Sequence, residues 1–176
     1  FTAEMPEWAV LIDWARRTSQ GPVGVGGSSL GALAAQLLST RARDWASHLQ
    51  PDALFLVTHC GKVEDAAVRG ALAQVWGTHA ATRANGWTET EANRWRGLLD
   101  PQGPPVMGAE NVVSVLGQRD IVTPYDSGIE LIDSWNVPQR NRFIWRRGHF
   151  SVPMGLIRDH GPLDRLTEIF AALRTG

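Results

Sequence analysis

The apolar residues of this chain follow two spacings, one typical of amphipathic helices and one typical of buried strands. Helical spacing near the N-terminus predicts a helix over residues 4–17, which a glycine-proline pair ends. The stretch after residue 29 is apolar on most faces, which predicts a helix to about residue 45 that packs on a sheet. Further helices are predicted over residues 127–135 and at the end of the chain. The apolar positions are Trp8, Leu11, Ile12 and Ala15 in the first helix and Leu163, Leu166, Ile169, Phe170 and Leu173 in the last.

Four short apolar runs have the length of strands and are followed by turn residues. They lie at residues 23–26, 53–57, 111–117 and 142–146. The second run is apolar throughout, which is typical of a parallel sheet covered on both faces. Because these strands alternate with helices, the pattern predicts an α/β fold with a predominantly parallel sheet and helices on both faces.

Residues 62–105 interrupt this alternation. They contain at least two helical segments, near 63–76 and 89–99, whereas a simple crossover between strands needs far fewer residues. We therefore expect residues 1–61 and 106–176 to form the core and residues 62–105 to form a helical cap above the sheet. The cap contains three of the tryptophans, Trp76, Trp87 and Trp95.

Composition excludes several classes of function. The chain has 176 residues, of which 43% are hydrophobic and 20% charged, as in an ordinary soluble domain. Its formal net charge of −1 gives no electrostatic basis for binding nucleic acid or an anionic membrane. No apolar run reaches the roughly 18 residues of a membrane span, and no signal peptide is visible. The single cysteine, Cys60, excludes an intrachain disulfide framework and favours a cytoplasmic location.

The segment Gly27-Ser28-Ser29-Leu30-Gly31 joins the first predicted strand to the next helix and fits the G-x-S-x-G pattern. A serine on a strained strand-to-helix turn needs small neighbours two positions before and after it, because a side chain there would collide with the adjacent backbone. Ser29 is therefore the candidate nucleophile, and Ser28, which lacks such symmetric flanking glycines, is a candidate for the substrate pocket.

Two other strand ends carry the partners that a nucleophilic serine needs. Asp120 follows the third predicted strand and His149 follows the fourth. A serine hydroxyl is a poor nucleophile until a histidine accepts its proton, and a carboxylate orients that histidine. Since reactive groups of a parallel sheet collect at the carboxyl ends of its strands, we expect Ser29, Asp120 and His149 to lie together.

These stretches resemble the C-terminal half of an α/β-hydrolase of the esterase/lipase type. The matching segments are Gly26–Gly31, Val115–Pro124 and Arg147–Ser151, and the likeness covers most of the chain outside residues 62–105. The resemblance implies hydrolysis of a small-molecule carboxylic ester through an acyl-enzyme, with no metal or organic cofactor. It also implies that the Leu30 N–H forms part of the oxyanion hole and that the cap shapes the pocket with Trp76, Trp87 and Trp95.

The chain departs from that family in its number of strands. A full core has eight strands, and this chain holds only those that correspond to the last four. The absent part of the family's core includes the loop that supplies a second oxyanion-hole donor, and without it the first strand has an unpaired edge. Since the sequence opens at Phe1 without an initiator methionine, we expect a preceding segment or a second chain to complete the sheet.

Other interpretations remain open for individual residues. Gly24-x-Gly26 suggests a dinucleotide-binding turn, but Ser29 occupies the position of the third glycine. Asp120 could merely cap the following turn, and Asp126 competes with it as the acid. His59 follows a strand and could line the pocket or lie in the core. The remaining histidines, His48, His79 and His160, have less suitable contexts, and His59-Cys60 lacks the second pair that a metal site requires.

Other functions also remain open at this stage. The missing strands suggest a non-catalytic or incomplete hydrolase domain that acts as a binding or assembly module. Within the enzyme class, a thioesterase, amidase or peptidase would use the same three residues, because selectivity lies in the cap and the absent loops.

Overall fold

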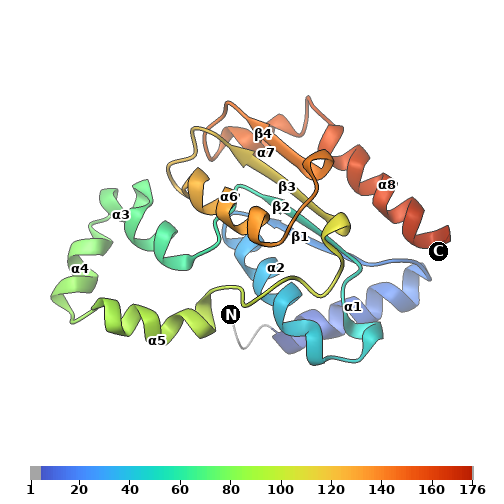
Figure 1. Cartoon of the computed structure of the whole chain (residues 1–176), viewed down its shortest axis with the longest axis horizontal. Helices are drawn as coiled ribbons and strands as arrows, with labels where there is room; N and C mark the ends of the chain where they lie inside the picture. The colour runs from blue at the N-terminus through green and yellow to red at the C-terminus, as the bar shows by residue number, and fades with distance from the viewer. Residues whose placement is uncertain (1–4, 176) are drawn as a thin grey trace.

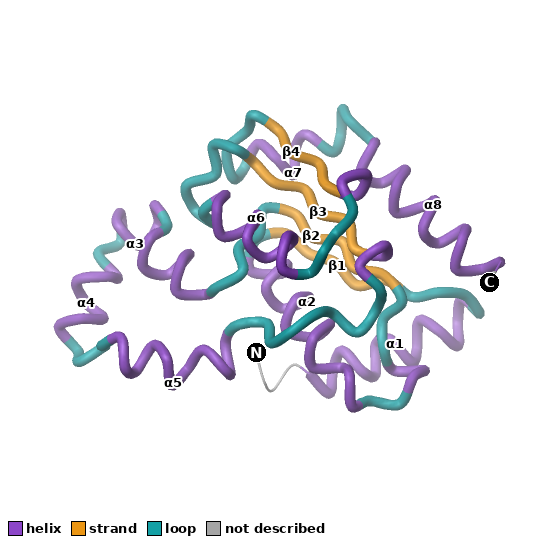
Figure 2. The backbone as a smooth tube through the Cα atoms, in the orientation of Figure 1, coloured by secondary structure: helices purple, strands orange, loops and turns teal. Residues whose placement is uncertain are grey.

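The computed structural model describes residues 5–175, which form a parallel sheet, helices on both of its faces, and a group of helices to one side (Figure 1). The strands are β1 (Gly24–Ser28), β2 (Ala53–Val57), β3 (Val112–Gly117) and β4 (Arg142–Trp145). They lie side by side in the order β1-β2-β3-β4, and every pair is parallel (Figure 2). The prediction of an α/β fold with a parallel sheet is therefore confirmed.

The helices belong to two groups. The core group packs on the sheet, and the second group lies between β2 and β3 in the sequence. The core helices are α1 (Met5–Ser19), α2 (Leu30–Arg41), α6 (Tyr125–Ser134), α7 (Ser151–Gly155) and α8 (Gly161–Thr175), and the second group holds the π-helical segment η4 (Asp65–Arg69), α3 (Ala71–Val75), α4 (Thr78–Ala84) and α5 (Glu89–Leu99). Short 3-10 turns lie at Ala42–Asp44, Ser47–Leu49, Ala109–Asn111 and Gln139–Asn141. Among residues 5–175, no helix is long and apolar enough to cross a bilayer.

Alternation along β2 explains why both faces of the sheet are covered. Successive side chains of a strand point to opposite faces. Leu54 and Leu56 join the main apolar cluster with residues of α1, α2 and α6. Ala53 and Val57 face the other way, toward clusters completed by α8 and α7, and Phe55 packs against both of these clusters. A continuous apolar run is therefore required at β2, which lies at the centre of the sheet.

Several helix predictions need correction. In α1, Leu11 is 54% exposed, because Met5 and Ile12 form the buried side of the helix, with Trp8 beside them. Glu4, where the helix was expected to begin, lies outside the described residues. Helix α2 ends at Arg41, before the residue 45 expected, and a 3-10 turn follows. Helix α7 was not predicted, since five residues are too few to reveal a period.

The single helix expected over residues 63–76 is broken at Gly70. The Gly70 N–H donates to the Asp65 carbonyl at 2.8 Å, which closes a π-type turn, and Gly70 itself is extended. A Cβ at Gly70 would overlap the carbonyl oxygen of Val122, and the next N–H, that of Ala71, donates to the Ile121 carbonyl at 2.6 Å. The break occurs where these helices contact the loop after β3.

Candidate active site

Ser29 lies on a strained turn between β1 and α2. Its φ is 56° and its ψ is −117°, a conformation that residues other than glycine rarely adopt. The Ser29 N–H donates to the Val57 carbonyl at 3.0 Å, and the Ser29 carbonyl accepts from the Leu33 N–H at 3.1 Å. The turn is therefore held between the end of β2 and the first turn of α2.

The small residues around Ser29 are required on one side only. A Cβ at Gly27 would overlap the backbone of Gly31 and the nitrogen of Ala32, so no side chain fits there. A Cβ at Gly31 would meet no atom within 4 Å. The expectation that both glycines are sterically necessary is wrong for Gly31. A side chain at Gly27 would strike the Gly31 backbone, whereas a side chain at Gly31 would point into open space.

Ser29, His149 and Asp120 form one chain of hydrogen bonds. The Nε2 atom of His149 lies 2.9 Å from the Ser29 Oγ, and Nδ1 lies 2.8 Å from the Asp120 Oδ2. With the ring protonated on Nδ1, His149 donates to Asp120 and accepts the hydroxyl proton of Ser29 on Nε2. The side chains of His149 and Asp120 are only 7% and 2% exposed, so water does not compete for the hydrogen bond between these two residues.

The carboxylate of Asp120 is held by its own loop. Oδ1 accepts from the N–H groups of Val122 at 2.9 Å and Thr123 at 3.0 Å, and Oδ2 accepts from the Thr123 hydroxyl at 2.9 Å. Burial raises the pKa of Asp120, but the hydrogen bond and charge of His149, together with the two backbone donors, outweigh it and leave that pKa below its ordinary value. Asp120 is therefore an ionised acceptor for His149.

Thr123 is a part of this site that the sequence pattern did not reveal. The segment Thr123-Pro124 reads as a turn, yet the Thr123 hydroxyl also lies 3.3 Å from Nδ1 of His149.

The competing acid, Asp126, is engaged elsewhere, since its Oδ2 accepts from Arg69 at 2.6 Å. That ion pair holds the pKa of Asp126 below its ordinary value.

A cavity of about 360 Å³ opens beside Ser29. It lies between the core and residues 63–82, and its lining within the described residues carries no charged side chain. Leu30, Leu33 and Val122 contribute from the core, and Leu72 and Trp76 contribute from α3 and its end. Of the tryptophans expected in the pocket, Trp76 lines this cavity, whereas Trp87 and Trp95 line a separate one.

Ser28 and His59 lie outside the lining of this cavity. The Ser28 hydroxyl is 3.0 Å from that of Thr58. His59 is 1% exposed, and its Nε2 is 2.8 Å from the Ser114 hydroxyl. Burial lowers the pKa of His59 to about 3, although the Asp120 charge opposes this shift, so His59 is a neutral core residue at physiological pH.

Cys60, like Thr123, lines the cavity beside Ser29 although no sequence pattern pointed to it. It follows β2 and donates its thiol proton to the Lys62 carbonyl at 3.3 Å. Burial, with a contribution from the Asp65 charge, raises the pKa of the thiol to about 12. Cys60 is therefore a protonated, unreactive part of the wall.

The first turn of α2 supplies a donor next to the nucleophile. Leu30 is the first residue of this helix, and N–H groups in the first turn have no carbonyl partner within the helix. The positive end of the helix dipole also points toward Ser29. Leu30 directly follows Ser29, so its N–H is the backbone donor adjacent to the candidate nucleophile.

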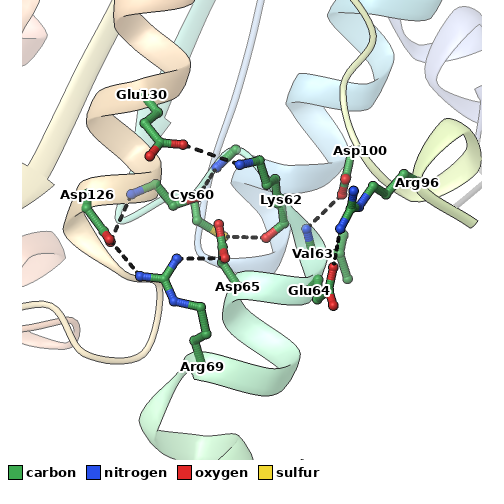
Figure 3. A network of polar contacts seen from close by, with 12 residues as sticks. Cys60, Lys62, Val63, Glu64, Asp65, Arg69, Arg96, Asp100, Asp126 and Glu130 are labelled. Atoms are coloured by element: carbon green, nitrogen blue, oxygen red, sulfur yellow. Dashed lines mark hydrogen bonds and ion pairs between the residues drawn. The ribbon is translucent and has the colours of Figure 1, made fainter. Parts of the chain in front are cut away.

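Ion pairs fasten the helices of residues 62–105 to the core (Figure 3). Arg69 bridges Asp65 at 2.8 Å and Asp126 of α6 at 2.6 Å, and Lys62 lies 3.3 Å from Glu130 of α6. Exposed pairs of this kind contribute about 1 kcal/mol or less each. These ion pairs are therefore a modest addition to the close backbone contact at Gly70.

Comparisons with known proteins add no assignment to this geometry. The chain matches no model of a protein family, and neither a curated protein nor a solved structure proved similar to it. Among the side chains that the structure describes, no group of three or more histidine, cysteine or acidic residues is arranged to hold a metal ion.

Proposed function

We propose that this chain is a serine hydrolase related to the α/β-hydrolases and that it cleaves carboxylic esters. One observation carries the proposal: Ser29, His149 and Asp120 come from three different strand ends and are joined by hydrogen bonds of 2.9 and 2.8 Å. The positive φ of Ser29 supports it, because strained backbone concentrates at functional sites. The apolar cavity beside Ser29 suits an uncharged acyl group better than a peptide.

The reaction proceeds in two halves. The Ser29 Oγ bonds to the acyl carbon while its proton passes to Nε2 of His149, and the carbonyl oxygen takes up the electron pair next to the Leu30 N–H. The intermediate collapses, the bond to the alcohol oxygen breaks, and His149 gives its proton to that oxygen. Water then attacks the acyl-enzyme in the same way, which releases the carboxylic acid and restores Ser29. Asp120 stays ionised throughout and stabilises the imidazolium.

We also propose that a further strand pairs with β1. The strand order leaves β1 at the edge of the sheet, with only β2 beside it among the described residues. Unpaired N–H and carbonyl groups of an edge strand accept another strand readily. A preceding segment or a second chain would complete the sheet, and its loop would supply the second oxyanion-hole donor.

The test is active-site labelling with a fluorophosphonate, followed by mass spectrometry of the modified peptide. We expect one label, on Ser29, and parallel hydrolysis of p-nitrophenyl butyrate. Ser29→Ala should abolish both, whereas the matched control Ser28→Ala should retain both, since Ser28 contacts Thr58 and not the cavity. Undiminished labelling of Ser29→Ala, or no labelling of the unmodified protein with its sheet completed, would refute the proposal.

A further inference from the structure

A second cavity, of about 190 Å³, lies among the helices of residues 62–105. Its apolar lining includes Val68 of η4 together with Trp87, Trp95 and Leu99. These helices bury few of their large side chains: among their residues whose exposure is described, the fully buried apolar ones are only Ala73 and Ala92. Larger apolar side chains of these helices, such as Trp87 and Leu99, line the cavity and are only partly buried. An apolar occupant would remove them from water, which is favourable in proportion to the area covered.

The two cavities adjoin each other at a common wall. Val63, Ala67 and Thr82 line both of them. Ala67 has the smallest side chain of the three and belongs to the π-helical segment η4, a kind of distortion that is frequent at functional sites. Ala67 is exposed where it lines the cavities. Because Ala67 lines both cavities, a larger side chain at this position would reduce the space of either one.

The charges around the second cavity are already engaged. Arg96 pairs with Glu64 at 3.1 Å, and the Asp100 Oδ1 accepts from the Val63 N–H at 2.8 Å (Figure 3). Burial raises the pKa of Asp100 above its ordinary value. Since the charged residues that line the second cavity already have partners, and none lines the cavity beside Ser29, an occupant that reaches through both would be apolar along its length.

We propose that the two cavities form one two-chamber site for an extended, unbranched hydrocarbon chain, and that Ala67 sets the chain length accepted. The assignment of this chain to the acyl group of the substrate rests on the proposed ester hydrolysis; the binding of the chain does not. Carbon atoms near the carbonyl would lie in the chamber beside Ser29, and the far end would pass Ala67 to lie between Trp87 and Trp95.

The first test measures kcat/KM for p-nitrophenyl butyrate, octanoate and dodecanoate. We expect kcat/KM to rise with length by up to about fourfold per buried methylene, the equivalent of ~0.8 kcal/mol. Ala67→Phe should lower the dodecanoate-to-butyrate ratio at least tenfold, and Ala92→Phe, which fills only the second chamber, should lower it from the far side. Ala80→Phe, an equal addition on an exposed position of α4, should leave the ratio unchanged. Equal ratios in all four proteins would overturn the proposal.

The second test measures binding without catalysis. Dodecanoate brominated at its terminal carbon is titrated into the Ser29→Ala protein, and tryptophan fluorescence is recorded. Quenching that disappears when Trp87→Phe and Trp95→Phe are added, but persists with Trp76→Phe, places the chain end in the second chamber. Quenching that is indifferent to Trp87 and Trp95 refutes the two-chamber site. Quenching as expected without any Ser29-dependent hydrolysis would leave this site standing and reject the ester hydrolase.

Discussion

Replacement of Asp120 by asparagine tests the proposed chemistry most directly. Asp120 accepts four hydrogen bonds, two from backbone N–H groups at Oδ1 and two, from Thr123 and His149, at Oδ2. In the Asp120→Asn variant, the carbonyl oxygen can keep the two backbone donors, so the amide nitrogen faces Nδ1 of His149. An amide nitrogen donates and does not accept, which forces the histidine proton onto Nε2. His149 then cannot accept the proton of Ser29.

The size of the effect follows from burial. The side chains of Asp120 and His149 are 2% and 7% exposed, so water cannot take the place of the lost acceptor. A wrong histidine tautomer in a serine triad lowers kcat by about 10⁴-fold, the equivalent of roughly 5 kcal/mol of transition-state stabilisation. We therefore expect kcat for p-nitrophenyl butyrate to fall by about 10³- to 10⁴-fold with little change in KM.

The matched control is Asp126→Asn, which removes a carboxylate six residues away that pairs with Arg69 and does not contact His149. Its kcat should stay within about twofold of the unmodified protein, because an exposed ion pair contributes about 1 kcal/mol or less to stability. Stopped-flow or steady-state release of p-nitrophenol measures both variants. A loss below tenfold in Asp120→Asn, or an equal loss in Asp126→Asn, would show that Asp120 does not orient the general base.

Three further predictions concern stability and reactivity. Gly27→Ala should lower the free energy of unfolding by about 3 kcal/mol, because the new Cβ overlaps the Gly31 backbone. Gly31→Ala should be neutral or stabilising by up to about 1 kcal/mol, because its Cβ meets no atom. Urea unfolding measures both variants, and an equal loss of stability in the two would contradict the steric argument. The Cys60 thiol, with a pKa near 12, should resist iodoacetamide at neutral pH in the native protein and react once urea unfolds it; rapid native labelling, followed by mass spectrometry, would count against its burial. The pKa of His59 is lowered from 6.5 to about 3 in the folded protein. Between these pH values the unfolded chain binds a proton that the folded chain does not. The free energy of unfolding should therefore fall as the pH drops from 6.5 toward 3, by on the order of a few kcal/mol. His59→Gln should flatten this part of the pH dependence in thermal unfolding, and an unchanged slope would contradict the assignment.

The sequence alone determined those features that depend on neighbouring residues. The run Ala53–Val57 predicts β2 at the bounds observed, because an uninterrupted apolar segment of strand length has few other stable placements. The strand-to-helix turn at Ser29 is encoded locally by small residues between two apolar segments. The positions of Asp120 and His149 follow from the rule that the carboxyl ends of parallel strands share one edge, and the structure brings both within hydrogen-bonding distance of their partners.

The tertiary structure decided which surface or neighbour each segment meets. Leu11 fits the helical period of α1 as well as Ile12 does, but only the packing of α1 on the core makes one exposed and the other buried. The helix break at Gly70 lies against Val122, far along the chain, whose carbonyl oxygen leaves no room for a side chain there. Trp87 reads like Trp76 in the sequence yet lines a different cavity. A periodic pattern specifies the conformation of a segment, whereas contacts between distant segments depend on loop geometry and packing that no local pattern contains.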